Sequence, residues 1–166
     1  MIKIREATLA DCGSLSKLKL SVWKTTYCGI YPKKKFDEYD FIANKNKFEN
    51  LVNNPDVQLF VVCDDSEVIG YMSCGALMRP FENYKQEIGL LYVSKDYQKI
   101  GLGRKLFDLA VLCIKKNGYD TFIVSCNKYN LKAQNFYAKM GGKIVHTDED
   151  NEDKSLPQVK FLYKVK

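Results

Sequence analysis

A glycine-bearing segment near the middle of the chain has the residue types of an anion site. The segment from Gln98 to Gly103, QKIGLG, follows a short apolar run at 88–93 and precedes apolar residues with helical spacing that end at Asn117. Glycines at the start of a helix leave backbone N–H groups uncovered, and these donors, with the positive end of the helix dipole, favour a phosphate. The pattern indicates a phosphate-bearing ligand, although a tight turn without a ligand has the same sequence.

Two common phosphate motifs do not fit this segment. A P-loop requires the pattern GxxxxGK[S/T], which the chain lacks. A dinucleotide-binding fingerprint requires a third glycine where Leu106 stands, and an acidic residue near the end of the next strand, where Ser125 and Cys126 stand. We therefore expect neither a P-loop nucleotide nor a dinucleotide of this type.

Strands and helices follow one another along the chain in an order that indicates an α+β fold. Alternating or short apolar runs predict strands at 3–7, 57–63, 68–76, 88–93, 121–126, 143–147 and 159–165, and helical spacing predicts helices at 8–22, 36–53, 102–116 and 131–140. Thr8 and Asp11 have the spacing of a capping box, and Asn130 is placed to cap the last helix. The order β-α-α-β-β-β-α-β-α-β-β predicts one domain over 1–166, with helices packed on a mixed sheet.

Composition excludes several classes of protein. With 46% hydrophobic and 28% charged residues the chain is globular, and no apolar run approaches the ~20 residues of a membrane span. The beginning of the chain lacks a signal-peptide core. Six cysteines without a CxxC pair and a single histidine, His146, predict reduced thiols in a cytoplasmic protein, with no disulfide frame and no metal site. The net charge of +6 favours an anionic ligand, and Lys33 to Lys35 are expected in a solvated loop.

Three motifs in the second half resemble the GNAT superfamily of acetyl-coenzyme A-dependent N-acetyltransferases. They are Gln98-x-x-Gly101-x-Gly103, the strand 90–93 just before it, and Asn130-x-x-Ala133-x-x-Phe136-Tyr137-x-x-x-Gly141. They occur in the order and at the spacing typical of the family, and cover roughly 87–145. The resemblance implies a central, mostly antiparallel mixed sheet of about seven strands flanked by about four helices. It also implies acetyl-coenzyme A as the acetyl donor.

The resemblance assigns cofactor-binding roles to residues of these motifs. Backbone N–H groups of the segment 98–104 would hold the pyrophosphate, and the strand around 91–93 would pair with the pantetheine arm as an added strand would. Family members splay this strand from the next one to admit the arm. Asn130 has two interpretations, as a helix cap and as a coenzyme contact, and the two are compatible. The implied cofactor-binding residues are Leu91, Tyr92, Val93, Gln98, Lys99, Ile100, Gly101, Leu102, Gly103, Arg104, Asn130, Ala133 and Tyr137.

Two residues are candidates for the chemistry of acetyl transfer. Tyr137 would be the general acid that protonates the departing thiolate, although Phe136 and Tyr137 also have the spacing of core aromatics. Glu87 would accept the amine proton directly or through a water, although a solvent-exposed carboxylate at a strand end has the same sequence. Strand alternation puts Glu87 on the face of Gly89 and Leu91. No cysteine has a basic partner in sequence, so we expect direct attack in a ternary complex.

The amine acceptor is the least determined part of the site. Trp23, Tyr27, Tyr31 and the loop 81–84 come from regions that wall the acceptor pocket in this family, and would suit a small cationic amine or a peptide N-terminus, or form an ordinary core edge. A non-catalytic acyl-coenzyme A-binding or sensor module is the alternative function. Scattered basic residues and the acidic run 148–153, expected as a solvated hairpin loop, argue against nucleic acid as a partner. No membrane partner is expected, and the sequence allows a monomer or a homodimer.

Overall fold

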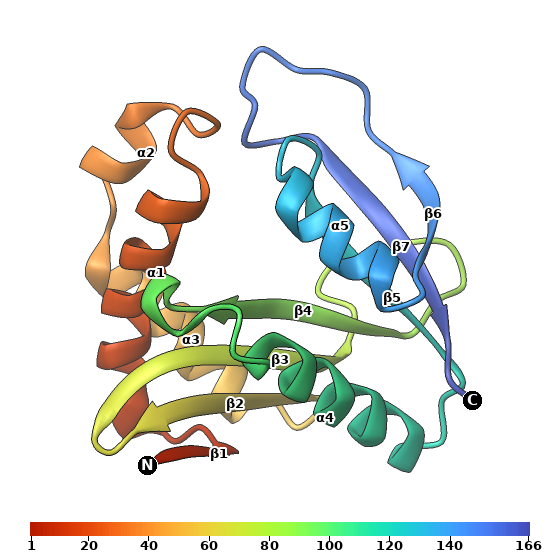
Figure 1. The fold of residues 1–166 in the computed structure, drawn as a ribbon, viewed down its shortest axis with the longest axis horizontal. Helices are drawn as coiled ribbons and strands as arrows, with labels where there is room; N and C mark the ends of the chain where they lie inside the picture. The colour runs from red at the N-terminus through yellow and green to blue at the C-terminus, as the bar shows by residue number, and fades with distance from the viewer.

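The computed structural model describes residues 1–166 and contains one seven-stranded sheet, in the spatial order β1-β2-β3-β4-β5-β7-β6 (Figure 1). All neighbouring strands are antiparallel except β4 and β5, which are parallel. The strands are β1 (Ile2–Glu6), β2 (Val57–Asp64), β3 (Glu67–Ala76), β4 (Gln86–Val93), β5 (Thr121–Asn127), β6 (Lys143–Thr147) and β7 (Gln158–Lys164). The seven strands expected from the sequence are thus present, and no strand end differs from its expected position by more than two residues.

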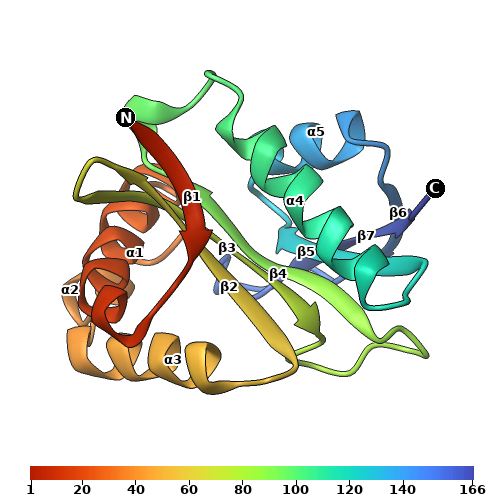
Figure 2. The same cartoon turned by 90° about the horizontal axis from the view of Figure 1, so that it is seen from below.

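Four α-helices cover the two faces of the sheet, and the short helix α2 packs on α1 (Figure 2). Helices α1 and α3 pack on β2 and β3 from one side, whereas α4 packs on β3 and β4 and α5 on β5 and β7 from the other. The helices are α1 (Cys12–Thr26), α2 (Lys33–Asp37), α3 (Phe41–Asn53), α4 (Leu102–Lys116) and α5 (Leu131–Lys139), with short 3-10 turns at Leu9–Asp11 and Lys95–Tyr97.

Each face of the sheet has its own hydrophobic core because the strands alternate. On β2, Phe60 and Val62 join the core under α4 and α5, while Leu59 and Val61 join the smaller core under α1 and α3. Burial on both faces explains why this strand reads as a continuous apolar run rather than as an alternating one.

The first half contains one more helix than expected. Helix α1 continues to Thr26, so Trp23 lies on it rather than in a loop. The region 36–53 is not one helix but α2 and α3, because Asp40 caps α3 by accepting a hydrogen bond from the Ala43 N–H at 2.8 Å. Lys33 to Lys35 lie in α2, so the prediction of a loop there is wrong.

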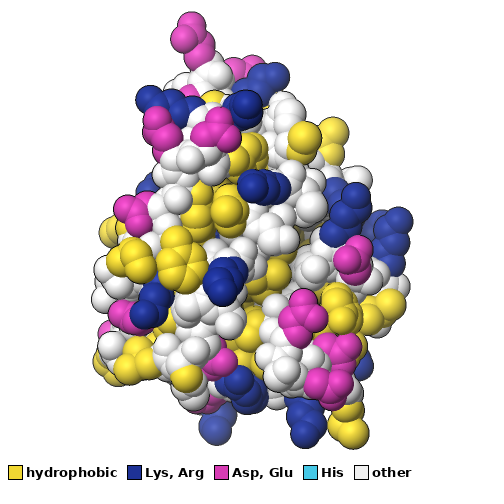
Figure 3. All heavy atoms as spheres, turned by 90° about the vertical axis from the view of Figure 1, so that its left-hand side faces the viewer, with side chains coloured by type: hydrophobic (Ala, Val, Ile, Leu, Met, Phe, Trp, Pro, Cys, Tyr) yellow, Lys and Arg dark blue, Asp and Glu magenta, His cyan; other side chains and the backbone are white.

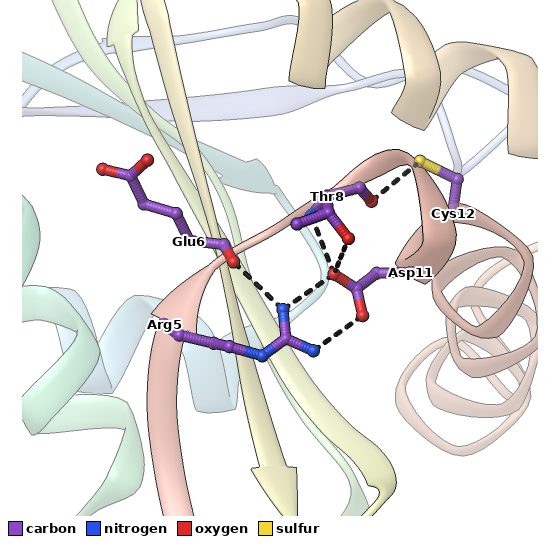
Figure 4. A network of polar contacts seen from close by, with 5 residues as sticks. All are labelled: Arg5, Glu6, Thr8, Asp11 and Cys12. Carbon is purple, nitrogen blue, oxygen red and sulfur yellow. Dashed lines mark hydrogen bonds and ion pairs between the residues drawn. The ribbon is translucent and has the colours of Figure 1, made fainter.

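The capping box at the start of the chain is confirmed and is extended by an arginine (Figure 4). The Asp11 carboxylate accepts hydrogen bonds from the Thr8 N–H at 2.7 Å and from both terminal nitrogens of Arg5 at 2.8 Å. The Arg5 guanidinium is the largest influence that lowers the Asp11 pKa from 3.8 to about 2. Because the pKa of this carboxyl is depressed in the folded state, the contacts stabilise the fold above pH 3.8 and lose this effect as the pH falls to about 2.

Charges of both signs are interspersed on the side of the molecule that carries α1, α2 and α3 (Figure 3). On α2, Lys33 and Lys34 pair with acidic residues one turn later, at 4.0 and 3.8 Å. This side therefore has no continuous basic surface. None of the helices is long and apolar enough to cross a membrane.

The two central strands, β4 and β5, pair over only part of their length. Glu87 faces Ile123 and Ile88 faces Val124, and beyond these two pairs the strands diverge (Figure 1). The sheet therefore opens in the middle, with β4 on one side of the opening and β5 and β7 on the other.

A β-bulge in β4 sets which side chains face this opening. Ser73 of β3 pairs with Leu90 and Cys74 pairs with Ile88, so Gly89 has no partner. A Cβ atom on Gly89 would lie 3.0 Å from the Ser73 hydroxyl and 3.0 Å from the Met78 side chain, which explains the glycine.

The bulge overturns one expectation from simple alternation. Ile88 belongs to the core under α4 and α5, and Leu91, three residues later, packs against that same core. Glu87, which precedes Ile88, therefore does not share a face with Leu91, because the extra residue in the bulge reverses the alternation beyond it.

Candidate functional site

A cavity of about 500 Å³ occupies the opening between β4 and β5. Its walls come from both halves of the sheet, from the end of α1, from α2 and α5, and from the loops before β4 and β7. Of the residues predicted from the sequence, the cavity wall includes Tyr27, Tyr31, Glu87, Leu91, Tyr92, Asn130, Ala133 and Tyr137. Trp23, Val93 and the segment 98–104 lie outside the wall.

The diverging part of β4 presents a strand edge to the cavity. Leu91 and Tyr92 line it, and β5 no longer pairs with their backbone. The amide groups on such an edge can pair with an extended ligand that carries amides of its own. The Val93 side chain is instead buried in the core, and the Val93 carbonyl accepts a hydrogen bond from the Gln98 side chain at 2.9 Å.

The glycine-bearing segment forms the start of α4, as expected. Gly101 precedes the helix with φ +87°, a left-handed conformation that glycine adopts readily. The first helical hydrogen bond runs from the Lys105 N–H to the Gly101 carbonyl at 3.1 Å. The N–H groups of 102–104 therefore precede the hydrogen-bonded ladder and are available to an anion at this helix start.

The side chains of Gln98, Lys99, Ile100 and Arg104 leave the backbone of this segment uncovered. Gln98 connects β4 to α5, because its amide nitrogen donates to Val93 and its amide oxygen accepts from the Lys132 ammonium at 2.6 Å. Lys99, with φ +65°, and Ile100 are exposed. Arg104 is exposed too, and pairs with Asp108 at 3.9 Å. The backbone of the loop thus remains open to solvent.

Helix α5 places Tyr137 in the cavity wall. The Asn130 side chain caps the helix by accepting a hydrogen bond from the Ala133 N–H at 3.1 Å, as predicted. Two turns later the Tyr137 ring is 6% exposed and packs against Phe136 and Phe161. Its hydroxyl has no hydrogen-bond partner within the protein, and burial raises the pKa of this phenol, which is therefore protonated at neutral pH.

Glu87 lies in the cavity wall at the point where β4 and β5 begin to diverge. One carboxylate oxygen accepts a hydrogen bond from the Met78 N–H at 2.9 Å. Burial raises the pKa of this carboxyl, and the Met78 N–H and the positive charge of Lys160 partly oppose the increase. Glu87 is thus a half-buried carboxylate inside the cavity and not a solvent-exposed strand end.

A group of aromatic residues closes the cavity on the α1 side. The hydroxyls of Tyr27 and Tyr92 lie 2.9 Å apart, and the Tyr27 and Tyr31 rings stack at 4.0 Å between centroids. Trp23 does not reach the cavity but packs edge-on against Tyr31 from behind, with the ring centroids 5.4 Å apart. Tyr27, Tyr31 and Phe81 of the predicted loop 81–84 are therefore in the cavity wall, and Trp23 supports them from outside.

The sequence did not predict several polar residues of the wall. Lys35 comes from α2, Arg79 from the loop before β4, Ser125 from β5, and Gln158 and Lys160 from β7. On β7, Val159 and Phe161 are buried while Gln158 and Lys160 point to the opposite face. The polar residues at alternate positions of this strand were a signal, but only the topology shows that they face the cavity.

The acidic run after β6 is a largely exposed hairpin connection, as expected, and several of its carboxylates have partners. Asp150 pairs with Lys128 at 2.9 Å, and Asp148 accepts a hydrogen bond from the Gln158 N–H at 2.8 Å. These contacts hold the connection to β7 beside the cavity, where Ser155 and the exposed Leu156 join the wall. The structure brings together no group of three or more His, Cys, Asp or Glu side chains that would suit a metal ion.

Comparison with known proteins agrees with this arrangement. Residues 20–142 match the acetyltransferase (GNAT) family. The chain is 28% identical over 158 residues to a spermidine N(1)-acetyltransferase of Thermoplasma acidophilum, covering 89% of this chain and 91% of the relative. It is 27% identical over 126 residues to an uncharacterised N-acetyltransferase of Bacillus subtilis, covering 75% of this chain and 70% of the relative.

Solved structures of acetyltransferases share the fold over nearly the whole chain. The crystal structure of the PaiA N-acetyltransferase from Thermoplasma acidophilum in complex with coenzyme A has a TM-score of 0.80, 23% identity and 99% coverage of both chains. A ribosomal-protein-alanine N-acetyltransferase from Brucella melitensis has a TM-score of 0.75 and 21% identity, covering 98% of this chain and 99% of that one. The expected sheet of about seven strands with flanking helices is confirmed, with five helices instead of four. Because the family match extends over most of its length, the chain belongs to the acetyltransferase (GNAT) family.

Proposed function

We propose that the chain transfers the acetyl group of acetyl-coenzyme A to a primary amine by direct attack in a ternary complex. The observation that carries this proposal is the opening between β4 and β5, whose cavity has both Tyr137 and Glu87 in its wall. A phenol and a carboxylate in one cavity provide a proton donor and a proton acceptor, which aminolysis of a thioester requires.

The residues around the opening fit the cofactor. The N–H groups at the start of α4 suit the pyrophosphate, and the unpaired edge of β4 at Leu91 and Tyr92 suits the amides of the pantetheine arm. Asn130 and Ala133 line the opposite side of the same cavity. Bound in this way, acetyl-coenzyme A would supply an activated acetyl thioester, and Tyr137 would be the proton donor for its sulfur.

Two residues of the chain would donate and accept the protons that move in the reaction. As the amine nitrogen bonds to the acetyl carbon and the carbon–sulfur bond breaks, Tyr137 gives a proton to the sulfur. Glu87 accepts the proton that the amine nitrogen loses, directly or through a water. Solvent then restores the proton of Tyr137, so the products are an N-acetyl amine and a free thiol.

Thermal denaturation with and without acetyl-coenzyme A tests the binding half of this proposal. A ligand at 100 times its Kd adds about 2.7 kcal/mol to the free energy of unfolding, so millimolar acetyl-coenzyme A is expected to raise the melting midpoint clearly. Release of free thiol in the presence of an amine panel then tests transfer. An unchanged midpoint would refute the proposal, whereas a raised midpoint without thiol release from any amine would favour the non-catalytic coenzyme-binding module.

Gly101 provides a matched pair of variants for the pyrophosphate loop. Gly101→Val should weaken acetyl-coenzyme A binding by about 10-fold or more, because a β-branched residue strongly disfavours φ +87° and the loop must then change shape. Gly101→Asn should bind nearly normally, because Asn tolerates a left-handed conformation and also caps helices well. Titration calorimetry of both variants measures the two affinities. Wild-type affinity in both variants would exclude Gly101 from the cofactor site.

Similarity to known proteins narrows the choice of amine acceptor but does not identify it. The curated relative named for spermidine makes a polyamine one candidate, and the solved structure named for a ribosomal protein makes a peptide N-terminus another. The charges of the cavity allow a more specific inference.

A further inference from the structure

The cavity wall carries more positive than negative charge. Lys35, Arg79 and Lys160 line the cavity, and Glu87 is the only acidic residue in its wall. An acceptor pocket for a polyamine would be expected to show the opposite balance, since a polyamine brings several positive charges of its own. The charges of the wall therefore indicate which amines the cavity accepts.

Lys160 is the cation most firmly placed in the wall. It extends from β7 to the face away from the core under α5, and its ammonium donates a hydrogen bond to the Ser125 hydroxyl at 3.1 Å. It also lies 5.2 Å from the centroid of the Phe81 ring, within cation–π distance. The hydroxyl and the ring hold the half-buried ammonium at a fixed place beside the cavity.

No carboxylate lies within 4 Å of the Lys160 ammonium. Asp148, on the β6 side, lies 2.9 Å from His146 and accepts a hydrogen bond from the Gln158 N–H at 2.8 Å, and it interacts with Lys160 only from a longer distance. Glu87 is held by the Met78 N–H and influences Lys160 only from a longer distance. The charge of Lys160 is thus left without an ion pair.

The other two cations differ in how far they are neutralised. The Lys35 ammonium has Asp153 at 4.0 Å and the Tyr31 ring at 5.4 Å, so a carboxylate already faces it. Arg79 is exposed on the loop before β4 and makes no ion pair or hydrogen bond through its side chain. Lys160 and Arg79 are therefore the two cations of the wall that are free to receive an anionic group.

These cations are separate from the phosphate part of the proposed cofactor site. The segment 98–104 does not line the cavity, and α4 lies on the sheet face opposite to the Lys160 side chain. Lys160 and Arg79 instead share their part of the wall with Glu87, the proposed acceptor of the amine proton. Their charge is directed at the acceptor end.

We propose, resting on the proposed function, that the acceptor is an amine that also carries a carboxylate, as an amino acid does. Lys160 binds that carboxylate together with Arg79, because hydrogen bonds between a cation and a carboxylate are the strong, charge-assisted kind. Tyr27, Tyr31 and Phe81 pack against the body of the acceptor. A polyamine is a poor acceptor, because each further ammonium group meets the like charge of Lys160 in a half-buried site.

The same arrangement orients the acceptor for the reaction. With its carboxylate held by Lys160, the amine nitrogen is directed to Glu87, the proposed acceptor of its proton, and only the neutral amine can attack the thioester. Lys160 thus selects the acceptor and positions its amine.

Matched acceptors test the proposal directly. Each amino acid is compared with the amine left by its decarboxylation: lysine with 1,5-diaminopentane, ornithine with 1,4-diaminobutane, and phenylalanine with phenethylamine, with spermidine and an N-terminal peptide amide added. Binding to the coenzyme A-loaded protein is measured by calorimetry, and thiol release from acetyl-coenzyme A is measured separately. We expect at least one amino acid to bind about 10-fold or more tightly than its partner amine, and no pair to be reversed.

Lys160→Gln and Lys164→Gln form the matched variants, because both remove one lysine charge from β7 but Lys164 is exposed and lies outside the cavity wall. Lys160→Gln should raise the KM of the preferred amino acid about 10-fold and leave that of phenethylamine, which has no second charge, unchanged. It should lower the KM of the two diamines, whose second ammonium group no longer meets a like charge. Lys164→Gln should change neither. A normal shift of the melting midpoint by acetyl-coenzyme A shows that each variant is folded.

The possible results separate the two proposals. Preference for spermidine, for the peptide amide or for the decarboxylated amines overturns the inference, as does failure of every amino acid to bind, or an equal effect of Lys160→Gln on both members of a pair. Tight amino-acid binding without thiol release would support the inference while refuting the transferase activity.

Discussion

Tyr137→Phe is expected to lower kcat by about 10²–10⁴-fold and to leave the affinity for acetyl-coenzyme A unchanged. The substitution removes only the hydroxyl, and the ring keeps its contacts with Phe136 and Phe161. A general acid placed at the leaving group contributes a factor of this size, equivalent to roughly 3–5 kcal/mol of barrier. The Tyr137 hydroxyl has no partner within the protein, so its removal breaks no hydrogen bond that the fold needs. Single-turnover kinetics with saturating cofactor measures the effect.

Tyr119→Phe is the control for this experiment. Tyr119 is 41% exposed, and it does not line the cavity. Its variant should react at the wild-type rate. If Tyr137→Phe also reacts at that rate, Tyr137 is a core aromatic only and another donor must protonate the thiolate. If it fails to bind acetyl-coenzyme A, its role is structural.

Glu87→Gln is expected to lower kcat about 10²-fold and to change the shape of the pH–rate profile. Only the ionised carboxylate can accept the amine proton, and burial raises the pKa of Glu87 above its usual 4.5. The wild-type rate should therefore fall with decreasing pH at a value above 4.5, in addition to the decrease caused by protonation of the acceptor amine. The glutamine variant should lose the part of the profile that belongs to Glu87. A profile that Glu87→Gln leaves unchanged would point to a water as the acceptor instead.

Glu87→Gln should not destabilise the protein. A carboxyl whose pKa is raised in the folded state stabilises the fold when protonated, and it becomes less favourable as the pH rises through that pKa. At neutral pH the ionised Glu87 therefore lowers the free energy of unfolding, and a neutral amide of the same shape removes this effect while its oxygen can still accept from the Met78 N–H. Glu67→Gln, which changes an exposed carboxylate at the start of β3, is the control for both rate and stability.

Lys160 and Glu87 place opposite charges at two points of the cavity wall, which would bind different groups of the acceptor. Glu87 is the only acid of the wall and is held by one backbone N–H, whereas Lys160 is held by a hydroxyl and an aromatic ring. Both are half-buried, so their charges act across the cavity with less screening than charges on the open surface would have. The amine of the acceptor is then directed to Glu87 and the carboxylate to Lys160.

The sequence by itself determined those parts of the protein whose geometry is local. Gly101 marks a left-handed residue before a helix, and Asn130 marks a helix cap. Both conformations depend on residues within one or two turns, so their spacing could be recognised without knowledge of the fold. Strand and helix order followed from periodicity for the same reason, and the family resemblance of 87–145 rests on these local patterns.

Only the tertiary structure decided which side chains meet in the cavity. Lys160 and Arg79 lie 81 positions apart in the sequence, and no local pattern places them in one wall. The bulge at Gly89 depends on the register between β3 and β4, so alternation along β4 alone gave the wrong face for Leu91. The charge of the cavity wall is therefore a property of strand pairing and loop placement. These depend on contacts between distant segments, which a single sequence does not specify residue by residue.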